Sequence, residues 1–361
     1  MQLELCNVCR KVGDSMHIND VSLTFQAGTL NILLGPTLSG KTSLMRLMAG
    51  LDRPTSGRIL ADGRDVIGVP VQKRNVAMVY QQFINYPNLT VYDNIASPLR
   101  IAGVAKQVIQ QKVREIAQLL KLTDMLQRTP LELSGGQQQR TALARALVKG
   151  ADLVLLDEPL ANLDYKLREE LREELPKIFS VTGAIFVYAT TEPSEALLLG
   201  GHTVTLHEGA VTQFSPTLEV FRRPRNLITA QTMSDPPLNL IPVTREGNCL
   251  QYGEKLCIPV NGKFSALTGR KYTVAFRPNH FHLNKPATEA IEVQGRVVVT
   301  EITGSESYIH VDVEGRRWVV LAHGIHNLAI DAVIPLYLDP AKFYLFDTDE
   351  NLVFTPDAIT A

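Results

Sequence analysis

Apolar residues follow two alternating patterns along the first two-thirds of the chain. Mostly or wholly apolar runs such as Leu30–Leu34 and Leu153–Leu156 have the length of buried strands. Between such runs, Lys106–Leu120 and Gln137–Val148 repeat apolar residues every three or four positions, which predicts helices. Strands that alternate with helices indicate an α/β core with a buried, largely parallel sheet. Further strands are predicted at Leu3–Val8, Val21–Phe25, Val76–Tyr80 and Ala184–Tyr188, and further helices at Lys41–Ala49, Tyr165–Ser180 and Ser194–Leu199.

The pattern changes near Arg222–Pro242, a proline-rich stretch that we interpret as a linker because proline disfavours helix interiors and central strands. Short strands separated by turns follow it, which predicts a small β barrel or sandwich. We therefore expect two domains, residues 1–225 and 226–361, with a helical subdomain at about 88–150 inside the first. The later strands are predicted at Tyr272–Phe276, Ile291–Thr300, Tyr308–Val313, Arg317–Leu321 and Val333–Leu338.

Composition narrows the possible partners. The net charge of −1 over 361 residues argues against a protein that binds nucleic acid through a broad basic surface, so no nucleic-acid partner is expected. No apolar run is long enough to cross a bilayer, and Met1–Leu5 lacks the features of a secretion signal. Any role at a membrane is therefore expected to act through a partner.

The four cysteines predict neither a metal site nor a disulfide framework. Cys6 and Cys9 form a C-x-x-C, but no second Cys or His pair completes a zinc site, so we interpret them as ordinary strand thiols. Cys249 and Cys257 fall in a predicted β-hairpin. No disulfide is expected, in keeping with a reducing cytoplasm.

A glycine-rich loop follows the strand Leu30–Leu34. It fits the phosphate-loop pattern, which needs a strand before it and a helix after it. Backbone N–H groups of such a loop surround phosphate oxygens, Lys41 reaches the β- and γ-phosphates, and the Thr42 hydroxyl is placed on Mg²⁺. The alternative is a chance Gly-rich turn. The expected ATP-binding residues here are Gly35, Pro36, Thr37, Leu38, Ser39, Gly40, Lys41, Thr42 and Ser43.

Two carboxylates, Asp157 and Glu158, end the buried run Leu153–Leu156. Ligands of open α/β sheets bind at the carboxyl ends of the strands. We expect Asp157 to hold the hydration shell of Mg²⁺ and Glu158 to polarise the attacking water.

A second anion-binding turn precedes the helix Gln137–Val148. It consists of Ser134, Gly135, Gly136 and Gln137, a hydroxyl and glycine N–H groups at a helix N-terminus. One nucleotide does not need two phosphate cradles. The turn is therefore expected to act in trans, on the γ-phosphate of a nucleotide held by another subunit in a head-to-tail dimer.

These motifs, in this order, resemble the ATP-binding cassette family. The resemblance implies a P-loop NTPase cassette, a RecA-like core plus a helical subdomain, that uses ATP and Mg²⁺. It makes Gln81 the glutamine that contacts Mg²⁺ and senses the transporter, Phe83–Leu99 the surface that receives the membrane subunits, and Asp164 of the Asn162–Asp164 loop a dimer-interface residue.

Within that family the chain resembles the ATPases of carbohydrate and polyol importers, with glycerol as the expected solute. The resemblance implies an OB-fold-like regulatory domain at the C-terminus, with landmarks at Pro236–Leu240, Phe276–Pro278 and Leu345–Asp347. It also implies a peripheral location on the cytoplasmic face of the inner membrane. The implied partners are a second ATPase cassette subunit, two transmembrane permease subunits and, through the complex, a periplasmic solute-binding protein.

Two positions depart from the family pattern. Val12 stands where the family has an aromatic residue that stacks on adenine, and Thr191 stands where it has a switch histidine. We expect a slow site in this chain, whose Ser134–Gln137 turn completes a more active site on a different partner. The alternatives are a homodimer for a sugar or glycerol phosphate, a soluble regulatory ATPase, and a cassette that does not hydrolyse ATP.

Overall fold

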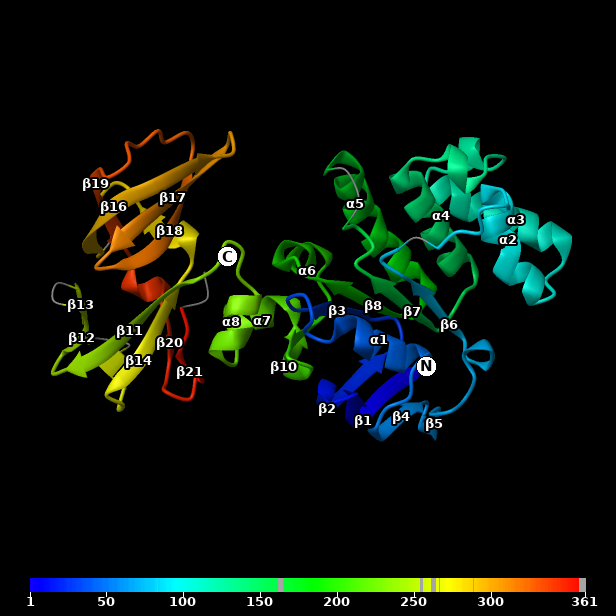
Figure 1. Cartoon of the computed structure of the whole chain (residues 1–361), viewed down its shortest axis with the longest axis horizontal. Coiled ribbons are helices and arrows are strands. Elements are labelled where there is room, and N and C mark those ends of the chain that lie inside the picture. The colour runs from blue at the N-terminus through cyan, green and yellow to red at the C-terminus, as the bar shows by residue number, and fades with distance from the viewer. Residues whose placement is uncertain are drawn as a thin grey trace. The chain divides into compact units, whose positions relative to one another are not determined.

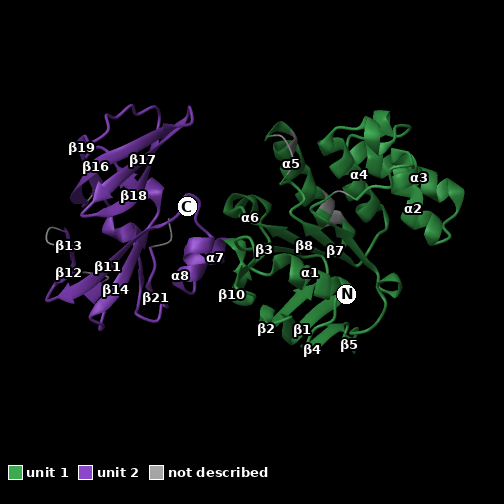
Figure 2. Cartoon of the chain, viewed as in Figure 1, with its two compact units in different colours: residues 1–217 green, residues 218–361 purple. Residues whose placement is uncertain are grey.

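The computed structural model describes residues 1–82, 84–161, 165–253, 256–260, 264–265, 267–287 and 289–356. The chain divides into two compact units, Met1–Thr217 and Leu218–Ala361 (Figure 2). Among the described residues, no helix combines the length and the hydropathy needed to span a bilayer.

The first unit begins with an antiparallel sheet (Figure 1). Along its first two strands, buried apolar residues alternate with more exposed ones. Its strand order is β2-β1-β4-β5. β1 and β2 form a hairpin that pairs Val12 with Ser15 and Lys11 with Met16. The strands are β1 (Gln2–Val12), β2 (Ser15–Gln26), β4 (Ser56–Ala61) and β5 (Arg64–Asp65).

The second sheet is the parallel sheet that the sequence predicts. Its order is β10-β9-β3-β8-β7-β6, and all strands except the edge strand β10 are parallel. Every residue of β7 and β8 is buried, which explains their uninterrupted apolar sequences. The strands are β3 (Leu30–Leu34), β6 (Val76–Val79), β7 (Leu153–Asp157), β8 (Ile185–Thr190), β9 (His202–His207) and β10 (Ala210–Pro216).

Helix α1 (Lys41–Ala49) joins the two sheets through one apolar core. Leu44, Met45, Leu47 and Met48 pack in a cluster with Phe25 of β2 and with residues of the parallel strands. The helix that follows the glycine-rich loop is thereby held on both sides, which fixes the position of its N-terminus.

The remaining helices of this unit agree with the predicted ones, apart from α2, which adds a helix to the predicted helical subdomain. α2, α3 and α4 pack against one another. The helices are α2 (Val91–Ile101), α3 (Lys106–Leu119), α4 (Gly135–Val148), α5 (Tyr165–Thr182) and α6 (Pro193–Leu199), with short 3-10 helices η1 (Val71–Lys73), η2 (Thr123–Met125) and η3 (Pro130–Glu132).

The second unit consists of two antiparallel sheets after two short helices, α7 (Thr217–Arg222) and α8 (Leu227–Thr232). The six-stranded sheet has the order β13-β12-β11-β14-β20-β21, with β11 (Asn239–Glu246), β12 (Cys249–Tyr252), β13 (Leu256–Pro259), β14 (Lys271–Phe276), β20 (Tyr344–Phe346) and β21 (Leu352–Phe354). The five-stranded sheet has the order β15-β19-β16-β17-β18, with β15 (Phe281–His282), β16 (Ile291–Ile302), β17 (Glu306–Val313), β18 (Arg316–His323) and β19 (Val333–Leu338). Two 3-10 helices, η5 (Pro278–His280) and η6 (Pro340–Lys342), lie between strands.

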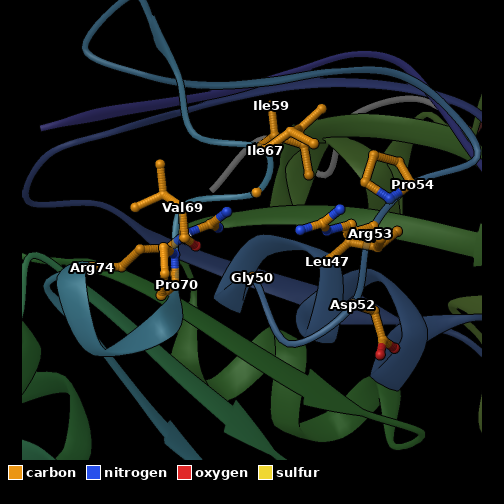
Figure 3. Close-up of a pocket in the computed structure, with 11 residues that line it drawn as sticks. Leu47, Gly50, Asp52, Arg53, Pro54, Ile59, Ile67, Val69, Pro70 and Arg74 are labelled. Carbon is orange, nitrogen blue, oxygen red and sulfur yellow. The ribbon is translucent and has the colours of Figure 1, made fainter.

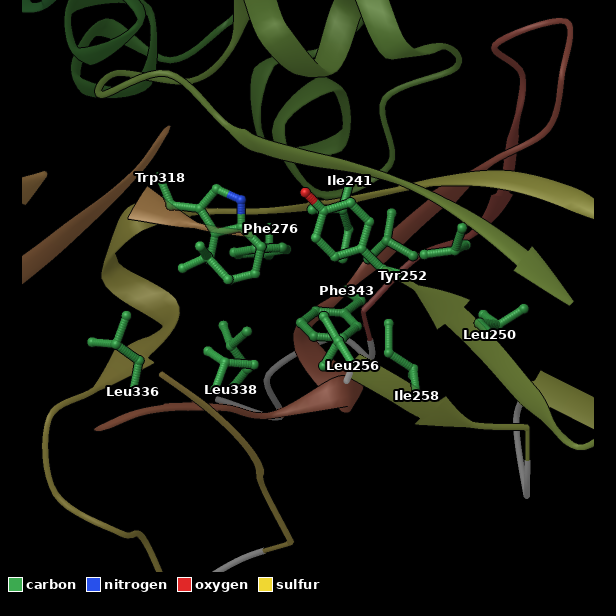
Figure 4. Packing of buried hydrophobic residues seen from close by; sticks show 14 of the residues in the cluster. Ile241, Leu250, Tyr252, Leu256, Ile258, Phe276, Trp318, Leu336, Leu338 and Phe343 are labelled. Atoms are coloured by element: carbon green, nitrogen blue, oxygen red, sulfur yellow. The ribbon is translucent and has the colours of Figure 1, made fainter. Parts of the chain in front are cut away.

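Aromatic rings from both sheets fill the core of this unit (Figure 4). Phe276 packs edge-on against Trp318, with ring centroids 5.3 Å apart, and lies 5.3 Å from the ring of Phe343. Both Phe276 and Trp318 are almost fully buried. The predicted β-rich domain therefore has an apolar core of its own.

Two expectations for this unit are wrong. The predicted linker Arg222–Pro242 contains α8, because the Asn226 side chain accepts a hydrogen bond from the Thr229 N–H and caps the helix. Residues 239–242 of the same stretch already belong to β11. Cys249 and Cys257 are joined as a disulfide, because the β12–β13 pairing brings their Cα atoms to 5.6 Å. The interpretation of Cys6 and Cys9 as strand thiols is confirmed: both are free and lie on β1.

Candidate functional site

The glycine-rich loop runs from the end of β3 to the start of α1. Gly40 is the N-cap of α1 at φ 103°, and a Cβ there would lie 2.9 Å from the His17 carbonyl oxygen, so only glycine fits. Leu38 also has a left-handed backbone, at φ 68°, and its side chain is 95% exposed. The loop therefore places backbone N–H groups and the positive end of the α1 dipole at one point, which favours an anion.

Lys41 lies at the centre of this loop and is almost fully buried. Its Nζ donates to the carbonyl oxygens of Gly35 (2.8 Å) and Pro36 (3.1 Å) and lies 3.7 Å from Glu158 Oε1. Burial lowers the pKa of the Lys41 ammonium, and the Glu158 and Asp157 charges oppose that change. A desolvated cation inside an anion-binding loop suits the recognition of a phosphate chain.

Glu158 follows β7, in a backbone conformation with φ 47° that non-glycine residues rarely adopt. Gln81, just after β6, donates through Nε2 to Glu158 Oε2 at 2.9 Å. The structure thus brings together the predicted base, the predicted sensor glutamine and the loop lysine. Strained backbone at such a point is typical of functional sites.

Asp157 and Thr42 form the part of the site that suits Mg²⁺. The Thr42 hydroxyl donates to Asp157 Oδ2 at 2.9 Å. Burial raises the pKa of the Asp157 carboxyl; the Thr42 hydrogen bond opposes this shift and the Glu158 charge adds to it. The described residues contain no cluster of three metal-ligating His, Cys, Asp or Glu side chains. Mg²⁺ does not require one, since it commonly takes one or two protein oxygens together with phosphates and water.

Lys41, Thr42, Gln81 and Glu158 border a hollow of about 400 Å³. The predicted residues Gly35, Pro36, Ser39 and Asp157 are not among those that line it. Met16 and His17, at the start of β2, also line it, and neither was predicted from the sequence. The signal that could have found them is the tight turn at Gly13, which folds β2 back beside the loop. The full lining is Met16, His17, Thr37, Leu38, Gly40, Lys41, Thr42, Ser43, Gln81 and Glu158.

Several predicted residues do not line this hollow. Val12 is 43% exposed at the end of β1, and Thr191 is exposed just after β8. Ser134 caps α4 through a capping box with Gln137, away from the hollow's lining. Asp164 lies outside the described residues.

A buried polar network holds the loop that contains Thr191. Glu195 Oε2 accepts hydrogen bonds from Tyr188 Oη (2.9 Å) and Thr190 Oγ1 (2.7 Å), and Arg172 Nη2 of α5 lies 3.3 Å from Glu195 Oε1. The Thr190 hydroxyl accepts in turn from the Glu192 N–H at 3.0 Å. Thr191 is therefore held between two fixed neighbours, and α5 is tied to the same loop.

A second hollow of about 170 Å³ lies at the other end of α1 (Figure 3). The Arg74 guanidinium borders it and donates to the carbonyl oxygens of Met48, Val66 and Val69. This contact places a cation at the C-terminus of α1, where the helix dipole favours it. The Asp52 carboxylate points away from Arg74 (Figure 3). It pairs instead with Arg46 and Arg10. The hollow therefore lies where the loops that support α1 pack together.

Comparisons with known proteins identify the family. A family model described as "ABC transporter" matches residues 18–161, and one described as "TOBE domain" matches residues 274–346. The trehalose/maltose import ATP-binding protein MalK of Thermococcus litoralis is 35% identical, over 96% of this chain and 97% of the relative. The chain belongs to the ABC transporter ATP-binding proteins.

Other relatives agree with this assignment. The sn-glycerol-3-phosphate import ATP-binding protein UgpC of Yersinia pestis is 34% identical, over 94% of this chain and 95% of the relative. The dimeric structure of the ATP-binding cassette MJ0796 bound to ADP and phosphate is 27% identical, with a TM-score of 0.55, over 60% of this chain and 98% of that one. The chain is thus an ATP-hydrolysing cassette followed by a TOBE domain.

Proposed function

We propose that this cassette energises an ABC importer for a small polyol or sugar, with glycerol as the preferred solute, from the cytoplasmic face of the inner membrane. Its partners are two transmembrane permease subunits, a second cassette and, through the complex, a periplasmic solute-binding protein. The relatives named as importers of trehalose/maltose and of sn-glycerol-3-phosphate support the solute class.

One observation carries the proposal: the chain has two phosphate-binding turns, and they start different helices. Gly35–Thr42 borders the nucleotide hollow, whereas Ser134–Gln137 does not. Ser134 and Gly135 are exposed, and a Cβ added at Gly135 would meet no atom within 4 Å. An exposed helix start that begins with two glycines suits a phosphate presented by another molecule.

We assign roles to the polar residues in and next to the hollow. Lys41 and the loop N–H groups hold the β- and γ-phosphates, and Thr42, Asp157 and Gln81 would hold Mg²⁺. The cation, when bound, neutralises charge on the phosphate oxygens. Glu158 is placed to accept a proton from the attacking water. Gln81 is hydrogen-bonded to Glu158, so a movement of the Gln81 segment also moves the base.

Thr191 supports an unequal pair of cassettes. A threonine can donate and accept hydrogen bonds, but it cannot carry the positive charge of an imidazolium. We infer that this chain's own hollow hydrolyses slowly and that its Ser134–Gln137 turn completes the more active site of the second cassette.

The test uses the assembled transporter in proteoliposomes with its solute-binding protein. Glu158→Gln in this chain should leave at least half of the ATP hydrolysis and glycerol uptake, because the second cassette does most of the turnover. In a symmetric homodimer, removal of the general base costs about 10²–10⁴-fold in rate. A loss of that size would refute the unequal pair.

Solute competition tests the preference for glycerol, and co-purification tests the association with permease subunits. Glycerol should compete for uptake better than maltose or sn-glycerol-3-phosphate. If the chain does not co-purify with any permease, we would conclude that it is a soluble regulatory ATPase instead.

A further inference from the structure

The hollow at the C-terminal end of α1 is separate from the nucleotide hollow. The described residues that line the one do not line the other. It measures about 170 Å³, which suits a molecule of a few heavy atoms rather than a nucleotide. The ATP-binding role of the cassette makes no use of it.

Two arginine side chains reach toward each other from opposite sides of this hollow (Figure 3). Arg74 is fixed, because its guanidinium donates to three backbone carbonyl oxygens, and it has more N–H donors than these three bonds use. Burial lowers the pKa of this guanidinium; the Asp65 charge, which opposes the shift, belongs to a carboxylate outside the lining. A partly desolvated cation attracts an anion more strongly than a solvated one does.

Arg53, on the other side, has no partner for its charge. Its backbone carbonyl accepts from Arg10 Nη1 at 2.8 Å, which holds this part of the chain. Within the described residues its guanidinium makes no hydrogen bond and no ion pair. An exposed arginine commonly needs no partner but water. Arg53 differs because it points into a hollow that a second guanidinium already borders, and like charges repel unless an anion lies between them.

The Asp52 carboxylate, although it belongs to the lining, does not offset these charges. It accepts two hydrogen bonds from Arg46, at 2.8 and 3.0 Å, and lies 3.3 Å from Arg10. No Glu and no second Asp is among the described residues that line the hollow. The C-terminus of α1 would repel an anion, but Arg74 binds the Met48 carbonyl there. The hollow therefore presents uncompensated positive charge.

Apart from these charged groups and two glycines, the lining is apolar. We propose that this hollow binds a small aliphatic carboxylate, with its oxygens between the guanidinium groups of Arg53 and Arg74 and its hydrocarbon chain against the apolar side chains. Guanidinium and carboxylate groups match in a planar, two-bond geometry. An inorganic anion would leave the apolar surface uncovered. The apolar lining consists of Leu47, Pro54, Ile59, Ile67, Val69 and Pro70.

The position of the site sets its relation to ATP. The ligand would bind at the end of α1 opposite the phosphate loop, through residues that the nucleotide hollow does not use. Binding should therefore stabilise the folded first unit in proportion to occupancy, and it should not compete with ATP.

The experiment measures binding of butyrate to the full-length chain by ligand-observed NMR, with butyramide as the neutral molecule of the same shape. Butyramide should bind at least about tenfold more weakly than butyrate, because it cannot form the charge-assisted hydrogen bonds. Affinity should rise by up to about fourfold for each CH₂ added from acetate to butyrate, as burial of the hydrocarbon chain requires. Saturating Mg²⁺-ATP should leave the affinity for butyrate unchanged.

Arg53→Gln tests the site with little risk to the fold, because Arg53 is exposed and its guanidinium has no bond to lose among the described residues. It should weaken butyrate binding about tenfold or more and leave the affinity for ATP unchanged. Arg53→Lys should lie between this variant and the wild type, since lysine keeps the charge but not the planar fork. Arg58→Gln, which changes an exposed arginine of β4 outside the lining, is the matched control and should bind butyrate as the wild type does.

Four results would show that the hollow is not a carboxylate site. They are no binding of butyrate to the wild type, equal binding of butyramide and butyrate, equal butyrate binding by Arg53→Gln and Arg58→Gln, and binding of inorganic phosphate as tight as that of butyrate. Circular dichroism of each variant checks that the fold is unchanged.

Discussion

Removal of the Glu195 carboxylate should destabilise the cassette unit more than any change to an exposed acid nearby. Glu195 is 4% exposed. Its carboxylate accepts hydrogen bonds from two hydroxyl groups and forms an ion pair with the Arg172 guanidinium. In Glu195→Ala, the buried hydroxyls of Tyr188 and Thr190 lose their acceptor. Each unsatisfied buried donor costs about 1–3 kcal/mol, and breaking a buried ion pair costs about 3–5 kcal/mol. Arg172 keeps its ion pairs with Glu169 and Glu192, which limits the loss. We therefore expect Glu195→Ala to lower the free energy of unfolding by about 3–5 kcal/mol in total.

Urea unfolding followed by two signals measures this cost for the correct unit. The chain has one tryptophan, Trp318, which lies in the second unit, so its fluorescence reports on that unit. Far-UV circular dichroism reports mainly on the helices of the first. Glu195→Ala should shift the dichroism transition and leave the fluorescence transition in place.

Two variants control for the interpretation. Glu195→Gln keeps an acceptor oxygen for both hydroxyls and should cost less than half as much. Glu173→Ala, on the exposed face of α5, should stay within about 0.5 kcal/mol of the wild type. If Glu195→Ala is also within 1 kcal/mol of the wild type, the network does not hold the Thr191 loop.

Two further predictions concern charge. Burial, together with the Lys342 and Arg277 charges, lowers the pKa of His280 to about 4, so the folded second unit binds fewer protons than the unfolded chain between pH 6.5 and 4. Its stability should therefore fall by up to about 3 kcal/mol as the pH drops from 7 to 4, and His280→Gln should flatten that slope in Trp318-monitored urea titrations. Burial raises the pKa of Asp157, so the folded cassette is destabilised as the pH rises above about 4 and the carboxylate ionises. Asp157→Asn should thus have a higher melting temperature than the wild type at pH 7, and the difference should be smaller at pH 4. The variant should also lose ATPase activity. An unchanged or lower melting temperature at pH 7 would contradict the predicted direction of the stability change.

Local patterns predicted correctly where the glycine-rich loop and the two carboxylates lie in the fold. The glycine-rich loop needs only its own strand and helix, and Asp157 and Glu158 end a strand whose burial is evident from four apolar residues. The parallel order that brings Gln81 to Glu158 follows from the general rule that the carboxyl ends of parallel strands meet at one edge.

The part of the hollow lined by Met16 and His17 could not be predicted in the same way. The start of β2 is held by the Gly209 turn, which is far along the chain and hydrogen-bonds both Asn19 of β2 and Ser39 of the loop. The resemblance pointed to Val12 on the same hairpin, and that role stays a prediction.

Composition led to two wrong predictions in the second unit. The prolines of Arg222–Pro242 suggested a linker, although Asn226 three residues before Thr229 is a helix-start signal. Cysteine count and compartment argued against a disulfide, but the hairpin that was itself predicted for Cys249 and Cys257 is enough to bring them together.

The central claim is that a glycine-lined turn in this chain closes over a nucleotide bound by its neighbour. An ATP analogue with a photoreactive group on the γ-phosphate, irradiated in the assembled transporter with Lys41→Ala in this chain, tests it most directly. The account predicts that peptide mapping still finds label on Ser134–Gln137, because the neighbour holds the nucleotide. Label that disappears from this segment with Lys41→Ala, or that never reaches it, would contradict the account.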